Sequence, residues 1–474
     1  MVCTRRDIPY FSFRFFQDFA LIYPVYVIMF ERTGLEFVQI SWLLVIWGLA
    51  VLVTEVPSGV IADLWSRRGV LFLALLLKAC GFIVWLLYPS FGGFAVGFVL
   101  WGIQEGLTAG VTEALLFDSL SRQGRDREFE AIAGLGTLVA RVAIAPAMIL
   151  GARLFAENPQ LVLLSSSAAM LVAACCALAM TGGAAARREH RSTRALDTHG
   201  SPHAPHAPHA PAAERAAPHA PHAELPPRHA AGRQPGAIAR ALPGTLTETL
   251  REIAASARVT LRVAGMPALV IAGSFGIVIY GVLDEYDTLF ATLHGVPLAW
   301  VGVWGALRFA CEGVGGVMAP RLSRLLAEAQ RSYGTQRSDG AREQATGSDA
   351  RSAPASNTEL AHFGRFGIWM ALAGVALLVA TTTALLSLLP LYFLFFGMMA
   401  AAEVVFEGFV QRRVSSAGRA TVGSLVSFLQ ELLGIGVLVL FGFVADAFGL
   451  RAIFQLGAAL LLIAGSVYAI RSPA

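Results

Sequence analysis

The chain has 474 residues, of which 56% are hydrophobic and only 14% are charged, and its mean hydropathy is +0.62. No soluble domain of this size has so apolar a composition, so the chain is expected to span a membrane. The net charge of +4 does not indicate nucleic-acid binding, because the basic residues lie in loops, where they set membrane orientation.

Twelve apolar segments follow one another along the chain, each about long enough for the roughly 20 residues that cross a bilayer. They are residues 9–30, 39–62, 69–88, 92–118, 129–152, 159–181, 264–291, 298–320, 363–384, 387–411, 421–444 and 450–471. The first segment follows Met1–Asp7 with no small-residue cleavage site, so it is expected to be a retained helix and not a signal peptide. The pattern predicts an all-α membrane protein of 12 transmembrane helices in two pseudo-symmetric six-helix bundles.

The domain boundaries follow from composition. Residues 1–181 form the N-terminal bundle, and residues 263–474 form the C-terminal bundle. The latter includes a cytoplasmic insert at about 326–362, which is expected to be disordered because it is rich in Ser, Gly and Asp. Between them, residues 182–262 carry His-Ala-Pro repeats. Proline at every third position favours polyproline II, so we expect a disordered spacer. Weak metal binding or pH sensing by its histidines is the alternative.

Arginine placement predicts the orientation. One set of loops holds Arg67, Arg68, Arg122, Arg125, Arg127, Arg321, Arg324, Arg365, Arg412, Arg413, Arg419 and the linker arginines, whereas the opposite set holds Arg32, Arg153 and Arg451. By the positive-inside rule, both termini and the long linker are cytoplasmic.

The sequence after the second apolar segment reads Gly59-Val-Ile-Ala-Asp63-Leu-Trp-Ser-Arg67-Arg68. A Gly, an Ala-Asp pair and two Arg at this spacing resemble the loop 2–3 signature of the major facilitator superfamily. Leu64 and Ser66 depart from that signature, which usually has an Arg and a second Gly there. The resemblance implies a transporter fold, and with the composition it implies a multi-pass protein of the bacterial inner membrane.

In that family the signature clamps the two bundles together in the outward-open state. The resemblance implies that Gly59 lets helix 2 approach helix 11, and that Asp63 faces the positive N-terminus of helix 11. It also implies that Arg67, beside Arg68, pairs with a carboxylate at the end of helix 4, where Asp118 lies. The alternative is a generic turn with positive-inside charge.

A similar stretch, Gly442-Phe-Val-Ala-Asp446, falls between helices 11 and 12, on the opposite side of the membrane. Because of that location, we do not assign it the role of the loop 2–3 signature.

Ionisable residues inside the apolar segments are candidates for a cavity wall, because burying charge in hydrocarbon is costly. Arg14 and Asp18 lie four residues apart in helix 1 and either neutralise each other or line a cavity. Glu105 in helix 4 is the candidate proton carrier. The resemblance is incomplete here, because Gly102 stands where proton-coupled members have an Arg. Arg141 in helix 5 requires an acidic partner or an anionic substrate.

The second half has its own candidates. Asp284 ends helix 7 and lies either in the cavity or at a wet outer mouth. In helix 8, Arg308 and Glu312 are spaced to neutralise each other. The remaining candidates are the acids Glu403 and Glu407 of helix 10 and Glu431 of helix 11. Lys78 in helix 3 is expected to be structural, since that helix is peripheral in the family.

These residues predict a secondary transporter that moves a small solute by alternating access. The excess of acids over bases within the spans favours proton-driven efflux of an amphipathic or cationic compound. The alternatives are uptake of an organic anion or nutrient, with Arg14 and Arg141 as ligands, and a non-transporting membrane sensor or scaffold.

The expected partners are the solute, protons and the lipid bilayer, without nucleic acid, and the expected state is a monomer. The five cysteines are scattered without metal-ligand spacing, and no phosphate-binding Gly-rich loop is present, so no metal, cofactor or direct use of ATP is expected. An enzyme is not predicted.

Overall fold

The computed structural model describes residues 4–64, 66–180, 266–338, 356–382, 388–413 and 419–471. Every regular element in these ranges is helical. The His-Ala-Pro linker predicted at 182–262 lies outside the described residues, so its role as a spacer stays a prediction.

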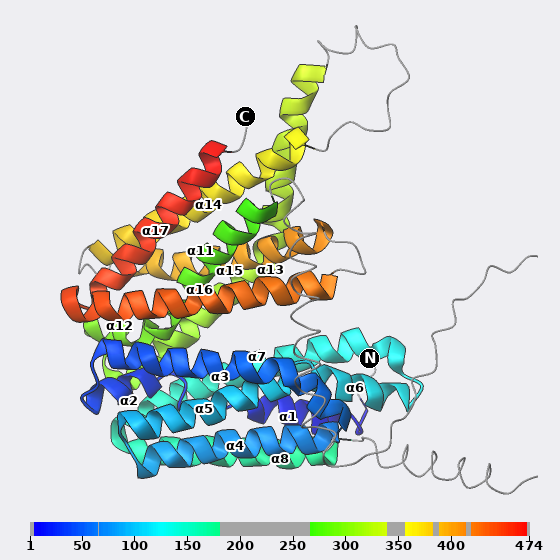
Figure 1. The fold of residues 1–474 in the computed structure, drawn as a ribbon, viewed down its shortest axis with the longest axis vertical. Helices are drawn as coiled ribbons and strands as arrows, with labels where there is room; N and C mark the ends of the chain where they lie inside the picture. Colours follow the sequence, from blue (N-terminus) through cyan, green and yellow to red (C-terminus); the bar gives the residue numbers. More distant parts are fainter. Residues whose placement is uncertain are drawn as a thin grey trace, which may run out of the picture.

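The helices form two groups, the N-terminal one in the lower half of Figure 1 and the C-terminal one in the upper half. The first group consists of α1 (Ile8–Asp18), α2 (Tyr26–Arg32), α3 (Phe37–Leu64), α4 (Arg67–Leu87), α5 (Phe91–Thr108), α6 (Val111–Ser121), the short η1 (Asp126–Glu128), α7 (Phe129–Glu157) and α8 (Pro159–Ala179). The second group consists of α11 (Met266–Glu285), α12 (Asp287–Leu293), α13 (Leu298–Ser338), α14 (Ser356–Thr382), α15 (Leu389–Arg413), α16 (Arg419–Phe448) and α17 (Leu450–Arg471).

Nine helical segments within the described ranges are long and apolar enough to cross a membrane. This confirms the predicted all-α membrane fold. The predicted helix 12, residues 450–471, coincides with α17, and most other boundaries agree within a few residues. The full count of 12 stays a prediction, because parts of the chain lie outside the description.

The predicted helix 1 is not continuous. It divides into α1 and α2, and the turns between them contain Pro24, which has no backbone N–H to donate. The linking backbone is buried against α8, where the Ile22 N–H donates to the Ser166 hydroxyl at 3.0 Å. Irregular backbone at membrane depth is tolerated where protein surrounds it or a cavity meets it, and this segment meets both conditions.

Helix 7, the first helix of the second group, is also divided. α11 ends at Glu285 and α12 begins at Asp287, with Tyr286 at the break. Helix 4 divides into α5 and α6 around Gly110, whose φ of 69° suits a glycine. Segment length and mean hydropathy did not locate these breaks, because apolar residues resume beyond each of them, although Pro24, the acids around Tyr286 and Gly110 mark the three positions in the sequence.

Helix 8 is longer than predicted. α13 continues past residue 320 to Ser338, so the first part of the predicted insert at 326–362 is helical, and α14 begins within its last part, at Ser356. The reason is local propensity, because Leu325-Leu326-Ala327-Glu328-Ala329 are all strong helix formers.

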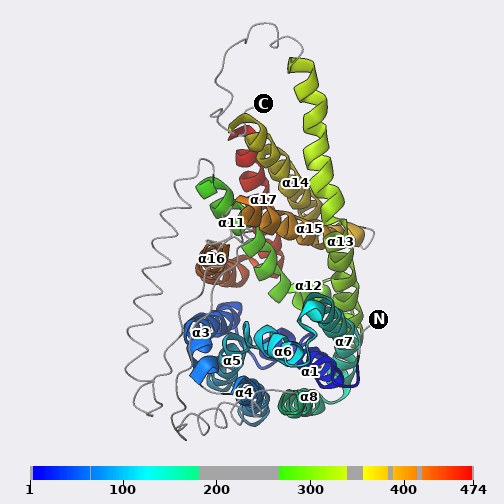
Figure 2. The same cartoon turned by 90° about the vertical axis from the view of Figure 1, so that its right-hand side faces the viewer.

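Two helix pairs make the most extensive contacts between the two groups in the described part of the chain. α7 packs on α13, and α3 packs on α16, which run side by side across the middle of Figure 1. Figure 2 shows the same pairs at the boundary between the groups.

We call the end of the molecule with the turns at 33–36, 88–90, 294–297 and 449 the outer end, after the predicted orientation, and the opposite end the inner end.

The backbones approach closely towards the outer end. A β-carbon at Gly302 of α13 would lie 2.0 Å from the Met148 carbonyl oxygen of α7, which no real side chain could do. The helix pair therefore depends on glycine at this position.

At the inner end, the chain before α1 is tied to the turn before α7. The Arg125 guanidinium lies 3.1 Å from Asp7 and 2.7 Å from Glu128, and it also binds the Thr4 hydroxyl. Burial alone would raise the pKa of Asp7, but hydrogen bonds from Arg125 and Thr4 outweigh it and hold that pKa below its ordinary value. The same carboxylates raise the pKa of Arg125, against the effect of burial.

We predict that Arg125→Ala lowers the stability of the protein by about 1–3 kcal/mol, because it leaves the buried Asp7 carboxylate without its main partner. Thermal unfolding in detergent measures the change. Arg127→Ala, at an exposed arginine two residues away, is the control and should be neutral.

The Asp7–Arg125 pair also predicts that the stability of the protein depends on pH. A carboxyl whose folded pKa is depressed contributes stability above its unfolded pKa of about 3.9, and loses that contribution as the pH falls through the folded pKa. The difference in the free energy of unfolding between wild type and Arg125→Ala should therefore have its full value at neutral pH and shrink below about pH 4. A difference that stays constant there would contradict the role of Asp7.

Candidate functional site

A cavity of about 570 Å³ lies between the two helix groups. Its residues come from α1, α2 and the turns between them, from α3 to α7, and from α11, α12 and α13. It extends from Tyr26 and Glu285 towards the inner-end residues Arg14, Gln17 and Glu113. The size and enclosure suit a small molecule.

The breaks in helices 1 and 7 lie at this cavity. Tyr23 and Tyr26 come from the first break, and Asp284, Glu285 and Asp287 flank the second. The two breaks touch, because the Tyr26 hydroxyl donates a hydrogen bond to the Glu285 carboxylate across the groups. Interrupted helices at corresponding positions in two halves of a transporter are the usual location of a substrate site.

Contacts nearer the outer end separate the cavity from that side. The Ser41 hydroxyl of α3 lies 2.5 Å from the Tyr286 hydroxyl, and both side chains are buried. Together, the Ser41–Tyr286 contact and the Tyr26–Glu285 hydrogen bond join α3 and α2 to the broken helix 7.

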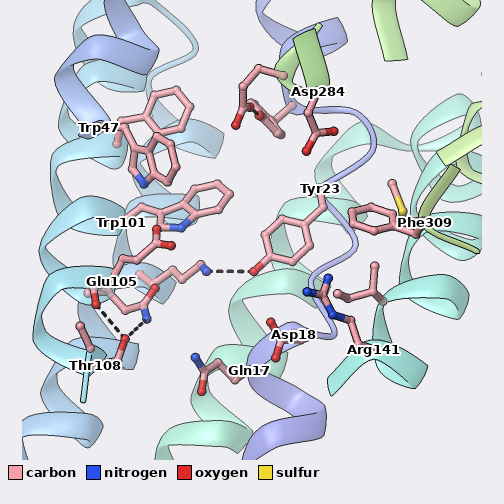
Figure 3. A pocket seen from close by; sticks show the side chains of 18 of the residues that line it. Gln17, Asp18, Tyr23, Trp47, Trp101, Glu105, Thr108, Arg141, Asp284 and Phe309 are labelled. Atoms are coloured by element: carbon pink, nitrogen blue, oxygen red, sulfur yellow. Dashed lines mark hydrogen bonds between the residues drawn. The ribbon is translucent and has the colours of Figure 1, made fainter. Parts of the chain in front are cut away.

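The N-terminal wall is aromatic. Figure 3 shows Trp47, Trp101 and Glu105 on one side of the cavity, with Asp18 and Arg141 across from them. Glu105 is exposed to the cavity although its helix is embedded in the group. Aromatic faces bind cations, and a carboxylate adds the opposite charge.

Lys78 lies within this wall, which corrects the expectation that it is peripheral. Its side chain from α4 is 4% exposed, and its ammonium donates to the Tyr23 hydroxyl at 3.0 Å (Figure 3). The same nitrogen lies 4.4 Å from the centre of the Trp101 ring and 5.2 Å from that of Tyr23. Lys78 thus places a cation in an aromatic enclosure at the cavity. Spacing alone did not indicate it, because Lys78 is the only charged residue within the predicted span 69–88.

The C-terminal wall is built around one buried cation. Arg308, with its side chain 3% exposed, lies 2.6 Å from Asp284 and 3.0 Å from Asp287. It also pairs with Glu312, as the four-residue spacing predicted. The predicted local pair is therefore part of a larger cluster that joins α11, α12 and α13.

Asp287 is the most enclosed carboxylate of this cluster, at 1% exposure. The Trp304 indole N–H and the Tyr392 hydroxyl both donate to its Oδ1 atom, each at 2.7 Å. A buried carboxylate is stable only with such partners, so Asp287 is structural. Asp284 is more open, at 36% side-chain exposure, and lies where a solute can reach it.

The predicted cavity residues divide into two sets. The structure brings Arg14, Asp18, Glu105, Arg141 and Asp284 together around the cavity. Arg14, Lys78 and Arg141 line the same cavity as Asp18, which favours the cavity-wall interpretation over an isolated Arg14–Asp18 pair.

The second set does not line the cavity. Glu403, Glu407 and Glu431 are absent from its lining within the described residues. Glu431 lies at the α3–α16 contact, with an oxygen 3.5 Å from where Gly48 would carry a β-carbon. Helical spacing put these acids within spans but could not tell which way they face.

The predicted clamp residues surround the start of α4. The Arg67 guanidinium lies 2.6 Å from Asp118 of α6, and Arg68 donates to the carbonyl oxygens of Leu178 and Met180 at the end of α8. Arg67 and Asp118 therefore pair as the resemblance implied. Gly59 and Asp63 belong to α3, but their side chains lie outside the described part, so the clamp as a gating device stays a prediction.

The helix groups, the interrupted helices and the enclosed polar cavity together define a polytopic membrane protein with a solute site between two bundles. A sequence model of the Major Facilitator Superfamily matches residues 11–438. The chain belongs to this superfamily of membrane transporters.

Solved structures agree on the fold. The nucleoside transporter NupG matches with a TM-score of 0.60 at 12% identity, over 98% of both chains. A bacterial homolog of the human lysosomal transporter Spinster, in an inward-facing and occupied conformation, matches with a TM-score of 0.61 at 15% identity, over 99% of this chain and 96% of that one. A D-xylose-proton symporter matches with a TM-score of 0.59 at 11% identity, over 98% and 95%. No curated protein matches by sequence.

We predict that Arg308→Met destabilises the protein by about 3–5 kcal/mol, because it leaves the enclosed Asp287 carboxylate without its cation. The double variant Arg308→Met with Asp287→Leu should recover part of that loss, since both buried charges are then removed. Thermal unfolding of four proteins tests this: wild type, the two single variants Arg308→Met and Asp287→Leu, and the double variant. Additive losses in the double variant would show that the two side chains are not coupled.

Proposed function

We propose that this protein is a secondary transporter that exports a small amphipathic or cationic compound in exchange for protons, by alternating access. The observation that carries the proposal is the composition of the cavity. Among the described residues, six acidic side chains line it, Asp18, Glu105, Glu113, Asp284, Glu285 and Asp287, against four basic ones, Arg14, Lys78, Arg141 and Arg308.

The aromatic wall supports the same class of solute. Trp47, Trp101, Tyr23 and Phe98 offer flat apolar faces to the cavity, which suits the apolar part of an amphipathic compound. The Oε1 atoms of Gln17 and Gln104 are buried without a hydrogen-bond partner among the described residues. Both are acceptors, so they favour a solute that brings N–H or O–H donors.

The cavity also argues for transport over a sensor or scaffold, because a non-transporting fold has no need of a charged chamber between its bundles. The cavity is closed at the outer end and extends towards the inner end, which corresponds to the inward-facing state of a transporter. The proposal places the protein in the plasma membrane of a bacterium, with both termini in the cytoplasm. It also holds that the protein acts as a monomer.

Uptake of an organic anion is the second candidate. Arg14 and Arg141 line the same cavity, and the Lys78 ammonium adds a third cation from the facing aromatic wall. An anionic solute would bind there, away from the acidic wall of α11.

Proton movement in inside-out vesicles distinguishes these functions. We expect particular organic cations to trigger proton release in wild type, and we expect Glu105→Gln to reduce it at least ten-fold, because Glu105 is the carboxylate in the aromatic wall. Glu130→Gln, at an exposed acid in the first turn of α7, is the matched control. A wild-type response in Glu105→Gln would exclude Glu105 as the proton carrier. Response to organic anions alone, lost in Arg141→Gln, would favour uptake.

The clamp has a separate test. Arg67→Ala should lower transport turnover about ten-fold while leaving membrane insertion intact, because it removes the tie from α4 to Asp118 that holds the loop 2–3 signature in place. Turnover is compared with that of Arg127→Ala, whose arginine is exposed in an inner-end loop. Wild-type turnover in Arg67→Ala would exclude the clamp.

A further inference from the structure

The second Gly-x-x-Ala-Asp sequence, Gly442-Phe-Val-Ala-Asp446, lies at the outer end of α16. Sequence considerations gave it no role because it falls on the wrong side of the membrane for the loop 2–3 signature. Its contacts in the structure are with α3, the helix that carries the first copy.

Asp446 caps the start of that helix. One carboxylate oxygen accepts the N–H of Phe37 at 2.8 Å, and the other accepts the N–H of Val38 at 3.0 Å. These are the first two residues of α3, whose amides have no partner within the helix. A carboxylate at this position also faces the positive end of the helix dipole. Asp446 thus joins the two bundles through a helix terminus.

Gly442 allows the helices to come close enough for this contact. A β-carbon at Gly442 would lie 2.3 Å from the Ser41 hydroxyl oxygen and 3.1 Å from the Val38 Cα atom. Any larger residue would push α16 away from α3. Ser41 in turn contacts Tyr286, so the packing at Gly442 is continuous with the outer closure of the cavity.

The two copies are related by their positions on one helix pair. Glycine and aspartate are four residues apart in each copy, so they share a helix face. One copy ends α3 at the inner end, and the other lies near the end of α16 at the outer end. By resemblance, Asp63 of the first copy faces the N-terminus of α16, as Asp446 of the second copy caps the N-terminus of α3.

We propose that Gly442 and Asp446 are positioning residues that form an outer clamp, the counterpart of the loop 2–3 clamp at the opposite end of the α3–α16 pair. The outer clamp holds the bundles together when the cavity opens inward, and it must release for the cavity to open outward. The equilibrium between the two states then depends on two opposing contacts of the same kind. This inference rests on the proposed alternating access.

The test is the distance between the outer ends of the bundles. Spin labels at Arg32→Cys and Phe448→Cys, both at exposed positions, report it by pulsed electron paramagnetic resonance in lipid nanodiscs, in a background without the five native cysteines. Asp446→Ala should raise the ratio of the long-distance to the short-distance population about five-fold, as expected for loss of a helix cap. Asp446→Asn keeps an acceptor and should have a smaller effect.

Two further variants separate a clamp from a merely structural contact. Glu157→Gln changes another exposed outer-end acid and should leave the distance distribution unchanged. Asp63→Ala should shift the populations in the opposite direction, and the double variant with Asp446→Ala should return them towards wild type. A structural role predicts loss of thermal stability without such compensation.

An unchanged distribution in Asp446→Ala would overturn the proposal. A shift in Asp446→Ala with none in Asp63→Ala would support the outer clamp and contradict the loop 2–3 clamp. A transport defect in Asp446→Ala without a change in distances would also overturn it, because the residue would then act through the solute site.

Discussion

The Arg308 cluster is the interaction on which the architecture of the solute site depends. A guanidinium buried within a membrane protein needs carboxylate partners, and Arg308 obtains them from the residues that flank the break in helix 7. The cluster fixes α11 and α12 against α13. Asp284 is open to the cavity, whereas Asp287 borders it but is enclosed by Trp304 and Tyr392. The same charge therefore stabilises the break and determines which acid a solute meets.

The two broken helices place the site at the junction of the bundles. Helix 1 supplies Tyr23 and Tyr26, helix 7 supplies Asp284 and Glu285, and the Tyr26–Glu285 bond connects them. Because these residues lie on short segments next to irregular backbone, small rotations of one bundle would change the contacts without unfolding a helix. The outer end of the α3–α16 pair lies beside this junction, so its packing and the closure of the cavity are physically linked through Ser41 and Tyr286.

The sequence was sufficient for the fold and for part of the site. Apolar length and arginine placement do not depend on tertiary contacts, so the helices and their order could be predicted. The Arg67–Asp118 pair followed from a motif with fixed spacing. By contrast, the breaks at residues 19–25 and at Tyr286 could not be located from hydropathy, since apolar residues continue on both sides of each break. The place of Lys78 at the cavity was not predicted, because its partners, Tyr23 and Trp101, come from other parts of the chain.

The central claim is that one cavity opens alternately to the two sides of the membrane. Ala109 lines that cavity and is exposed to it, so a single cysteine introduced there reports access directly. Ala109→Cys, in a background without the native cysteines, would be treated with a membrane-impermeant maleimide in inside-out and in right-side-out vesicles. The account predicts labelling from both sides, with the balance between them changed by a transported compound. Labelling from the inner side alone, under every condition and with every compound, would contradict it.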